Sequence, residues 1–374
     1  MSAKDSIANF TLAICSTLLA LGLVGATGEL AVRYRERHRS EVPGSMSLIF
    51  YQHSRLRHAL VRNYDYFGWA HIDAQGFRGR PVATEKPPDV LRIMVVGSST
   101  TFDPQVTGDA AAWPARLEVW LTRLSPERRY EVINAGVPGY RVIDDLIRLE
   151  TELYQYQPDL IILYEGHNDL FGALQHSGGE GGDEVDSSPS RPGELPVVTP
   201  WEHWLTSHSL LYVKIKKRLS VISFRSRGAT VLRSRQTASL DPILDRGAQN
   251  IARDVTAFLA VARGFGLRVA MPDLVNVSGV GATEEPDPKT RDAWHQAVPF
   301  VPPEVALSGY VRYSAAVREV AEHDGSAWIP TASCGLTGRK WYASEDPIHF
   351  NDTGADRFGE CIARALLAAG LTKK

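Results

Sequence analysis

Four short blocks of this sequence carry side chains that together can attack an ester carbonyl. In chain order they are Gly97-Ser98-Ser99-Thr100, Asn134-Ala135-Gly136-Val137-Pro138-Gly139, Gly166-His167-Asn168-Asp169 and Asp346-Pro347-Ile348-His349. Ser99 is the candidate nucleophile. A serine hydroxyl needs a base within hydrogen-bond reach, and the base needs a group that holds its tautomer. His349 is the candidate base, and Asp346 is the group that would orient it.

The same blocks offer donors for the negative charge that develops on the carbonyl oxygen. Removing one such donor typically costs about 3–4 kcal/mol of transition-state stabilisation. Gly139 follows a predicted strand at 130–134 and offers a backbone amide, and Asn168 follows a predicted strand at 160–164 and offers a side-chain amide. The backbone amide of Ser99 is the third candidate donor.

The elements that must position these blocks belong to an α/β fold. Apolar runs typical of buried parallel strands occur at 93–96, 130–134, 160–164, 267–271 and 327–330. Between them, helical spacing of apolar residues predicts helices at 113–124, 142–156, 241–264, 307–323 and 353–368. Such alternation predicts a parallel sheet covered on both faces. The first three blocks then lie at the carboxyl edge of the sheet, where open α/β folds bind ligands.

The fourth block differs, because Pro347 disfavours a continuous helix between its acid and its base. We therefore expect Asp346 and His349 on a loop or a short turn. Each block alone has a plainer interpretation. Gly136 and Gly139 suit a turn, Asn168 suits a helix cap, and the glycine-serine block suits a phosphate loop except that it lacks the Gly-Lys-Ser/Thr ending.

In this order the blocks resemble those of the SGNH hydrolases, also called the GDSL esterase/lipase superfamily. The resemblance runs from about Asp89 to Leu367 and implies a three-layer α/β/α sandwich, flavodoxin-like, with a five-stranded parallel sheet. One position departs from the family pattern, because Ser98 stands where the family name has Asp. Motif register favours Ser99 over Ser98 as the nucleophile. The segment 73–79 (Asp-Ala-Gln-Gly-Phe-Arg-Gly) resembles the lead-in of membrane-anchored bacterial members.

By motif position the resemblance also implies the roles of the site residues. It implies a catalytic triad of Ser99, Asp346 and His349, and an oxyanion hole made by Ser99, Gly139 and Asn168. The expected activity is hydrolysis of a carboxylic ester, with the acyl group carried on carbohydrate or lipid. Two alternatives stay open: an O-acyltransferase that acts on an envelope polysaccharide, and a non-catalytic binding module on the same fold.

We expect no cofactor and no metal at this site. The eleven histidines are scattered, and the sequence has no His-x-x-x-His or Cys-x-x-Cys spacing. A formal net charge of −2 shows no basic excess, so no nucleic-acid partner is expected. Of the three cysteines, Cys15 lies in an apolar run, whereas Cys334 and Cys361 either pair or both stay reduced.

The N-terminus predicts a membrane anchor at 1–32. Residues 10–26 carry no charge, and about 20 apolar residues are needed to cross a bilayer. The alternative is a cleaved signal peptide, since small residues stand at 24–26 (Val-Gly-Ala). The arginines at 33, 35, 37 and 39 favour a cytoplasmic catalytic domain, but long domains translocate regardless of such charges. The resemblance favours the cell envelope, so we expect a single-pass protein with an extracytoplasmic catalytic domain.

The predicted organisation is an anchor, a connector at 33–88 and a hydrolase domain at 89–374 with insertions at 176–240 and 279–303. Residues 176–200 are rich in Gly, Ser, Asp and Pro, which predicts either a lid over the site or a surface excursion. Residues 203–240 hold eight lysines and arginines and no acidic residue. They predict either a surface for anionic lipid or an acidic polymer, or a helix with a solvated basic face.

Overall fold

The computed structural model describes residues 3–37, 49–51, 53–66, 68–176, 205, 209, 211–212, 214–215, 240–282, 286–298, 301–344 and 346–373. The chain divides into two compact units. The first comprises Met1–Ile49 with Val198–Arg227, and the second comprises Phe50–Val197 with Gly228–Lys374. All four sequence blocks lie in the second unit.

The second unit is built on one five-stranded parallel sheet with the order β6-β5-β7-β8-β9. The strands are β5 (Val90–Gly97), β6 (Arg129–Asn134), β7 (Leu160–Tyr164), β8 (Arg268–Pro272) and β9 (Ala327–Ile329). Every residue of β5 and β7 is buried, as expected for strands covered on both faces. The predicted α/β fold with a five-stranded parallel sheet is confirmed. After β5 the chain forms β6 on one side of that strand, and it then returns to form β7 on the other side. The strand order therefore reverses at β5, and open α/β sheets bind ligands at such a topological switch point.

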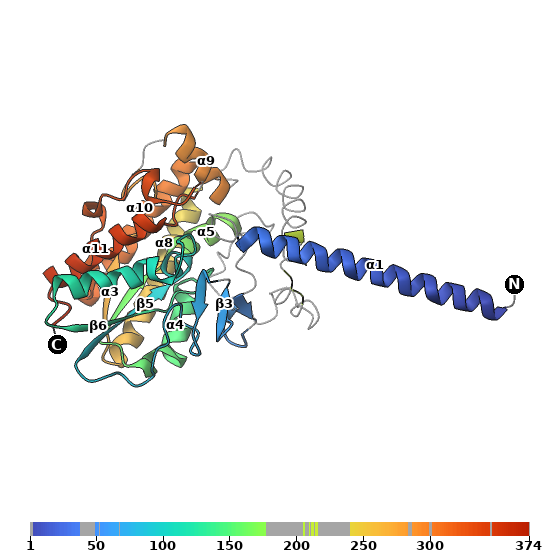
Figure 1. Ribbon diagram of the computed structural model, residues 1–374. Helices are drawn as coiled ribbons and strands as arrows, with labels where there is room; N and C mark the ends of the chain where they lie inside the picture. Colours follow the sequence, from blue (N-terminus) through green and yellow to red (C-terminus); the bar gives the residue numbers. More distant parts are fainter. Residues whose placement is uncertain are drawn as a thin grey trace. The chain divides into compact units, whose positions relative to one another are not determined.

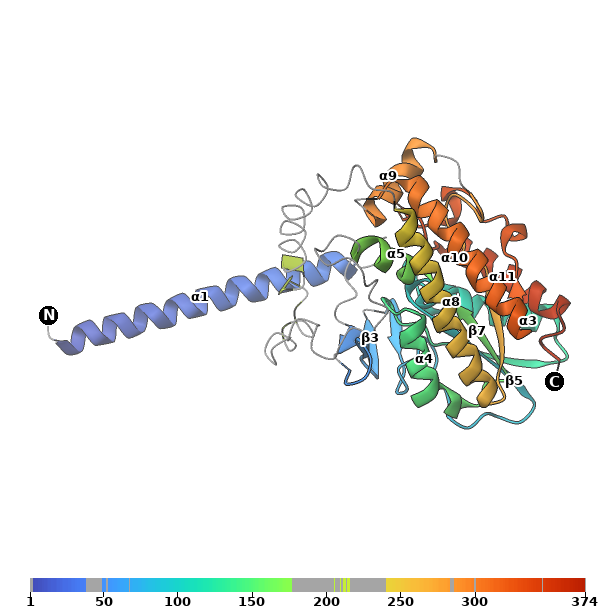
Figure 2. The same ribbon diagram turned by 180° about the vertical axis from the view of Figure 1, so that it is seen from behind.

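Two helical layers enclose this sheet. On one face α3 (Trp113–Leu124) packs against α11 (Asp352–Ala368), as the front of Figure 1 shows. The opposite face, seen in Figure 2, carries α4 (Val142–Thr151) and α8 (Asp241–Gly264), with α10 (Pro303–Asp324) packed on α8. The short helix α5 (His167–His176) also contacts α8 and α10.

Three helical segments differ from the sequence expectation. The helix predicted at 142–156 ends at Thr151 and continues as the 3-10 helix η3 (Leu153–Tyr156), because the backbone at Glu152 leaves the helical region and turns Leu153 and Tyr156 into the core. The helix predicted at 307–323 begins earlier, at Pro303, a residue that suits a first helical turn. The insertion at 279–303 contains a helix, α9 (Pro288–Ala297).

Residues 50–88, predicted as a connector, pack against the sheet. They form the hairpins β1 (Phe50–Tyr51) with β2 (Ala59–Leu60), and β3 (Tyr64–Tyr66) with β4 (Ala70–Ile72). The side chains of Tyr66, Trp69 and Phe77 are buried. The backbone amide of Arg78 donates to the carbonyl of Asn134 at the end of β6 (3.1 Å). This segment is therefore continuous with the body that holds the blocks, and the predicted boundary between 88 and 89 stays a prediction.

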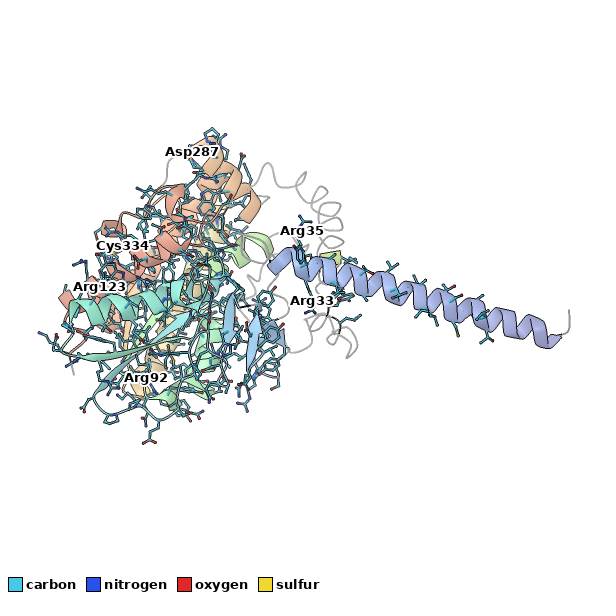
Figure 3. The ribbon with its side chains drawn as sticks, in the orientation of Figure 1. Arg33, Arg35, Arg92, Arg123, Asp287 and Cys334 are labelled. Atoms are coloured by element: carbon cyan, nitrogen blue, oxygen red, sulfur yellow. A yellow bond between two sulfur atoms is a disulfide. The ribbon has the colours of Figure 1, made fainter. Side chains whose placement is uncertain are left out.

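A disulfide joins Cys334, labelled in Figure 3, to Cys361, 27 residues later. Cys334 ends the 3-10 helix η4 (Ala332–Cys334), and Cys361 lies within α11. The pairing left open by the sequence is thus settled within the structure. The closed loop contains the fourth block, so both Asp346 and His349 lie inside it.

The first unit consists mainly of α1 (Ala3–Arg37). Its stretch Thr11–Arg35 contains an 18-residue window with a mean hydropathy of 1.8, none of that window is buried, and the stretch is long enough to cross a membrane. Arg33 and Arg35 lie at the C-terminal end of this stretch (Figure 3). Glu29 accepts hydrogen bonds from Ser209 Oγ (2.8 Å) and from the backbone amide of Leu211 (2.9 Å). The predicted lid at 176–200, except His176 at the end of α5, and most of the basic segment 203–240 lie outside the described residues.

Candidate active site

Ser99 lies two residues beyond the end of β5, at the first position of the short helix α2 (Ser99–Phe102). The turn into this helix depends on Gly97, whose φ of +153° favours glycine and whose added Cβ would lie 2.2 Å from the carbonyl oxygen of Tyr164. The amide of Ser99 belongs to the first helical turn, whose N–H groups have no partner within a helix. Strand, glycine and helix together present both the hydroxyl and the amide of Ser99 at the switch point.

A chain of hydrogen bonds connects Ser99 to the fourth block. Ser99 Oγ lies 2.8 Å from Nε2 of His349, and Nδ1 of His349 lies 2.7 Å from a carboxylate oxygen of Asp346. The other carboxylate oxygen of Asp346 accepts from the backbone amides of Ile348 (3.0 Å) and His349 (2.9 Å). As expected, the block is not helical. Its own backbone fixes the carboxylate, which in turn fixes the imidazole.

The electrostatics of this pair suit a base and its orienting acid. Burial alone would lower the pKa of His349, but the charge of Asp346 and the hydrogen bond to it outweigh burial and raise that pKa above its ordinary value. Burial alone would raise the pKa of Asp346, yet the charge and hydrogen bonds of His349 hold it below its ordinary value. Asp346 is therefore ionised near neutral pH, and His349 is a stronger base than a free histidine.

The second block forms a tight turn beside Ser99. The backbone amide of Val137 donates to the carbonyl of Gly97 (2.9 Å), and an added Cβ at Gly136 would lie 2.3 Å from the amide nitrogen of Phe102 in α2. The amide of Tyr140 donates to the carbonyl of Val137 (3.1 Å), which closes a four-residue turn. Gly139 has a φ of +89° and follows a proline, which are the features of a type II turn. Gly139 is exposed at the surface of this turn.

The third block is tied to the same turn. Asn168 lies in the first turn of α5, and its side-chain Nδ2 donates to the carbonyl of Tyr140 (2.8 Å). The same Nδ2 carries a second N–H. The structure thus joins Ser99, His349 and Asp346 in one hydrogen-bonded chain and links Asn168 to the turn that holds Gly139.

The family model described as the GDSL-like Lipase/Acylhydrolase family matches residues 95–357, which is more than half of the chain. The chain belongs to this family. It is thereby an esterase-type hydrolase, and its ester substrate follows from the family.

Three solved structures are similar to this GDSL-like acylhydrolase. One is LAE5, an alpha/beta hydrolase enzyme from the metagenome of Lake Arreo, Spain, with 14% identity over 76% of this chain and 96% of that chain and a TM-score of 0.43. The acetyl xylan esterase AlAXEase has 14% identity over 74% of this chain and 98% of that chain, with a TM-score of 0.42. Axe2, an acetylxylan esterase from Geobacillus stearothermophilus, has 13% identity, coverages of 74% and 93%, and a TM-score of 0.42. No curated protein matches the chain.

Behind the site of this GDSL-like acylhydrolase lie buried polar groups. Nδ1 of His167 lies 2.7 Å from the hydroxyl of Tyr310, and burial lowers the pKa of His167 to about 3, so its ring is neutral. Glu165 is buried after β7, and burial together with the charges of Asp145 and Asp169 raises its pKa well above the ordinary value. Within the described part of the chain, no group of three or more His, Cys, Asp or Glu residues is arranged to hold a metal ion.

Sequence reasoning missed two residues next to the blocks of this acylhydrolase. Asp103 ends α2, its carboxylate accepts from the amide of Trp113 (2.9 Å), and burial raises its pKa to about 7. His58 contacts the turn at Pro138 from the segment predicted as a connector. Neither belongs to a motif. For His58 the only signal was the dipeptide Pro138-Gly139, which predicts a turn that another group could hold in place.

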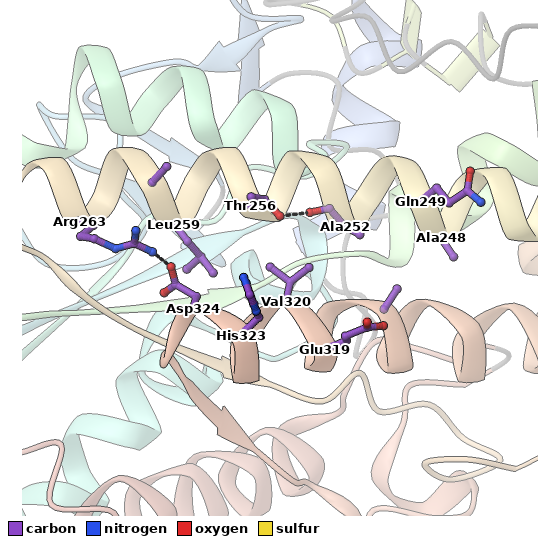
Figure 4. Close-up of a pocket in the computed structure, with 12 residues that line it drawn as sticks. Ala248, Gln249, Ala252, Thr256, Leu259, Arg263, Glu319, Val320, His323 and Asp324 are labelled. Atoms are coloured by element: carbon purple, nitrogen blue, oxygen red, sulfur yellow. Dashed lines mark hydrogen bonds and ion pairs between the residues drawn. The ribbon is translucent and has the colours of Figure 1, made fainter.

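A groove on the helical face of the acylhydrolase lies apart from the blocks. Figure 4 shows it between α8 and α10, with Arg263 and Asp324 forming an ion pair across the two helices. None of its lining residues belongs to the four blocks. The groove therefore takes no part in the site at the carboxyl edge of the sheet.

Proposed function

We propose that this GDSL-like acylhydrolase is a serine esterase that uses Ser99 as nucleophile, His349 as general base and Asp346 as the group that orients the base. The observation that carries the proposal is the pair of contacts made by His349, 2.8 Å to Ser99 Oγ and 2.7 Å to Asp346. Both lie within the range expected of a nucleophile and its base. The family membership independently supports ester hydrolysis.

The reaction has two halves in this proposal. Ser99 Oγ attacks the ester carbonyl and passes its proton to Nε2 of His349, which gives a tetrahedral intermediate and an imidazolium. The imidazolium then protonates the alcohol as the carbon–oxygen bond to that alcohol breaks, leaving an acyl group on Ser99. Water then attacks the acyl carbonyl while His349 accepts its proton. His349 returns that proton to Ser99 Oγ as the acyl–oxygen bond breaks, and the carboxylic acid leaves.

Three groups are proposed to stabilise the oxyanion of each tetrahedral intermediate. They are the backbone amides of Ser99 and Gly139 and the side-chain amide of Asn168. Their support is topological, because Ser99, Gly139 and Asn168 follow the neighbouring strands β5, β6 and β7. It is also local, because Asn168 hydrogen-bonds to the turn of Gly139. Donors of this kind typically contribute about 3–4 kcal/mol each.

The substrate is proposed to be a carboxylic ester whose acyl group is carried on carbohydrate or lipid. The proposed acceptor is water, and a sugar hydroxyl in place of water would make the enzyme an acyltransferase. Incubation with an aryl acetate, with and without an added oligosaccharide, separates these outcomes by the products formed. Acetate release supports hydrolysis, and acetylated oligosaccharide at the expense of acetate would overturn it.

The direct test is labelling with a fluorophosphonate probe followed by mass spectrometry of the adduct. We expect the adduct on Ser99 of the wild-type enzyme and none in the Ser99→Ala or His349→Ala variants. Ser99→Ala removes only a hydroxyl and should unfold near the wild-type temperature. His349→Ala removes the partner of the Asp346 carboxylate, so its folding must be checked by its unfolding temperature before the labelling result is used. A folded wild-type enzyme without adduct, or a Ser99→Ala variant with full hydrolysis, would overturn the proposal.

The apolar helix α1 is proposed to be a single-pass membrane anchor. A stretch of 25 residues spans about 37 Å as a helix, which exceeds the hydrocarbon core of about 30 Å. The Cys334–Cys361 disulfide supports an extracytoplasmic position for the catalytic unit, because disulfides persist in oxidising compartments. Added protease should degrade that unit in cells with a permeable outer surface while the inner membrane is intact. Protection under these conditions would place the unit on the other side.

A further inference from the structure

His58 contacts the turn that carries Gly139, although it precedes the first block and the matched family region. Nε2 of His58 lies 2.7 Å from the carbonyl oxygen of Pro138. The ring of His58 packs edge-on against Phe50 (4.5 Å between centroids) and lies against Tyr140 (5.3 Å). The hydroxyl of Tyr140 donates in turn to the backbone carbonyl of His58 (2.5 Å). The imidazole is therefore held from two sides while it faces Pro138.

The protonation of His58 follows from its surroundings. Burial lowers the pKa of His58 to about 4, an effect that the hydrogen bond to Pro138 only partly offsets. The ring is thus neutral near pH 7 and carries one N–H. Because a carbonyl oxygen can only accept, that N–H must be on Nε2, where it donates to Pro138.

The carbonyl of Pro138 and the amide of Gly139 belong to the same peptide group. The peptide is trans, since the described residues contain no cis peptide bond, so its C=O and N–H point in opposite directions. A hydrogen bond from His58 to the carbonyl oxygen therefore directs the N–H of Gly139 away from His58. The contact of His58 with the Pro138 carbonyl thus determines the direction in which the Gly139 N–H points.

The type of turn makes this contact decisive. In a four-residue turn closed by Tyr140, the central peptide between Pro138 and Gly139 can take two opposite orientations, which distinguish type I from type II. The φ of +89° at Gly139 corresponds to type II. A flip to type I would turn the Gly139 N–H to the opposite side and break the contact with His58. An added Cβ at Gly139 would also lie 3.2 Å from the His58 ring, which shows how closely the ring covers the turn.

We propose that His58 is a positioning residue of the oxyanion hole, which holds the Pro138–Gly139 peptide so that the Gly139 amide faces the substrate carbonyl. The inference rests on the proposed function, because it takes Gly139 as an oxyanion donor. It adds a contribution from residues 50–60 to catalysis. The oxyanion interaction is stronger in the transition state than in the ground state, so loss of His58 should lower kcat and leave KM nearly unchanged.

Two substitutions at this position separate the hydrogen bond from the packing. His58→Phe keeps a ring between Phe50 and Tyr140 but removes the donor, and we expect kcat to fall about 10- to 100-fold, less than the effect of deleting a whole donor. His58→Gln places an amide Nε2 at a similar reach, and we expect it to recover most of the wild-type kcat. The control is His71→Gln, because the His71 side chain is exposed on β4, and its kcat should equal that of the wild type.

The measurement is kcat and KM for an aryl acetate in the full-length enzyme, with unfolding temperatures of all variants and Ser99→Ala alongside. A folded His58→Phe variant with wild-type kcat would overturn the inference, as would equal losses in His58→Phe and His58→Gln. If Ser99→Ala is inactive in the same experiment, only the role of His58 has failed. If Ser99→Ala retains full turnover, the proposed function itself has failed.

Discussion

Ser99 Oγ and His349 Nε2 lie 2.8 Å apart although 250 residues separate them in the chain. The sheet accounts for one partner, since Ser99 follows β5, the strand between β6 and β7. The other partner arrives from the loop before α11, inside a ring closed by the Cys334–Cys361 disulfide. The contact thus depends on long-range packing and on a covalent link, and both can be perturbed separately.

The rate should depend on pH through His349. A general base must be neutral to accept a proton, so kcat/KM should rise with pH as His349 deprotonates. Because Asp346 raises the pKa of His349, we expect the midpoint of this rise above the ordinary histidine value of about 6.5. Asp346→Asn removes that charge, so the midpoint should fall, and kcat should drop about 10⁴-fold. A midpoint that stays in place in Asp346→Asn would contradict this assignment.

Asn168→Ala should lower kcat by about two to three orders of magnitude, the usual effect of losing one oxyanion donor. KM should change little, because the lost interaction forms mainly in the transition state. The substitution also frees the carbonyl of Tyr140, so the unfolding temperature must be measured alongside steady-state kinetics. Near wild-type kcat in the folded variant would remove Asn168 from the oxyanion hole.

The contribution of Asp103 to the stability of the enzyme should fall as pH rises from about 4 to about 7. Burial raises the pKa of Asp103 to about 7, so in this window the folded chain holds a proton that the unfolded chain releases. One such proton changes the unfolding free energy by about 1.4 kcal/mol per pH unit. Asp103→Asn cannot ionise, so its stability should increase relative to that of the wild type as pH rises through this window. Denaturant unfolding at pH 5 and pH 8 gives the change in unfolding free energy between the two pH values for each protein. An identical change in the wild type and in Asp103→Asn would refute the prediction.

Removal of the disulfide should destabilise the catalytic unit. The closed loop spans 27 residues, for which the chain-entropy model gives a loss of about 3.5 kcal/mol. We expect the Cys334→Ser/Cys361→Ser double variant to show this loss in denaturant unfolding relative to the oxidised wild type. Cys15→Ser is the matched control, since Cys15 is a free thiol outside that unit. Equal stability of the double variant and the wild type would show that packing alone holds the loop.

The sequence was sufficient to predict the sheet and its helices, because apolar runs and helical spacing depend on local residues. It also predicted that Asp346 and His349 occupy a loop, since Pro347 lies between them. The helix α9 was missed although Asp287 before Pro288 is a helix-start signal, and the structure shows Asp287 (Figure 3) accepting from the amides of Lys289 and Thr290. His58 could not be predicted, because its partner Pro138 lies 80 residues away and no motif joins them.

Because residues 50–60 pack onto the 137–140 turn, the start of the family match and the start of the working enzyme are two different positions in the chain. The family match begins at residue 95, yet the peptide that orients Gly139 is contacted by His58. A version of the enzyme trimmed to its recognisable homology would retain every motif residue and lose this contact. For truncation, chimera building or transplantation of the site, the smallest transferable piece therefore starts at the first hairpin, at Phe50.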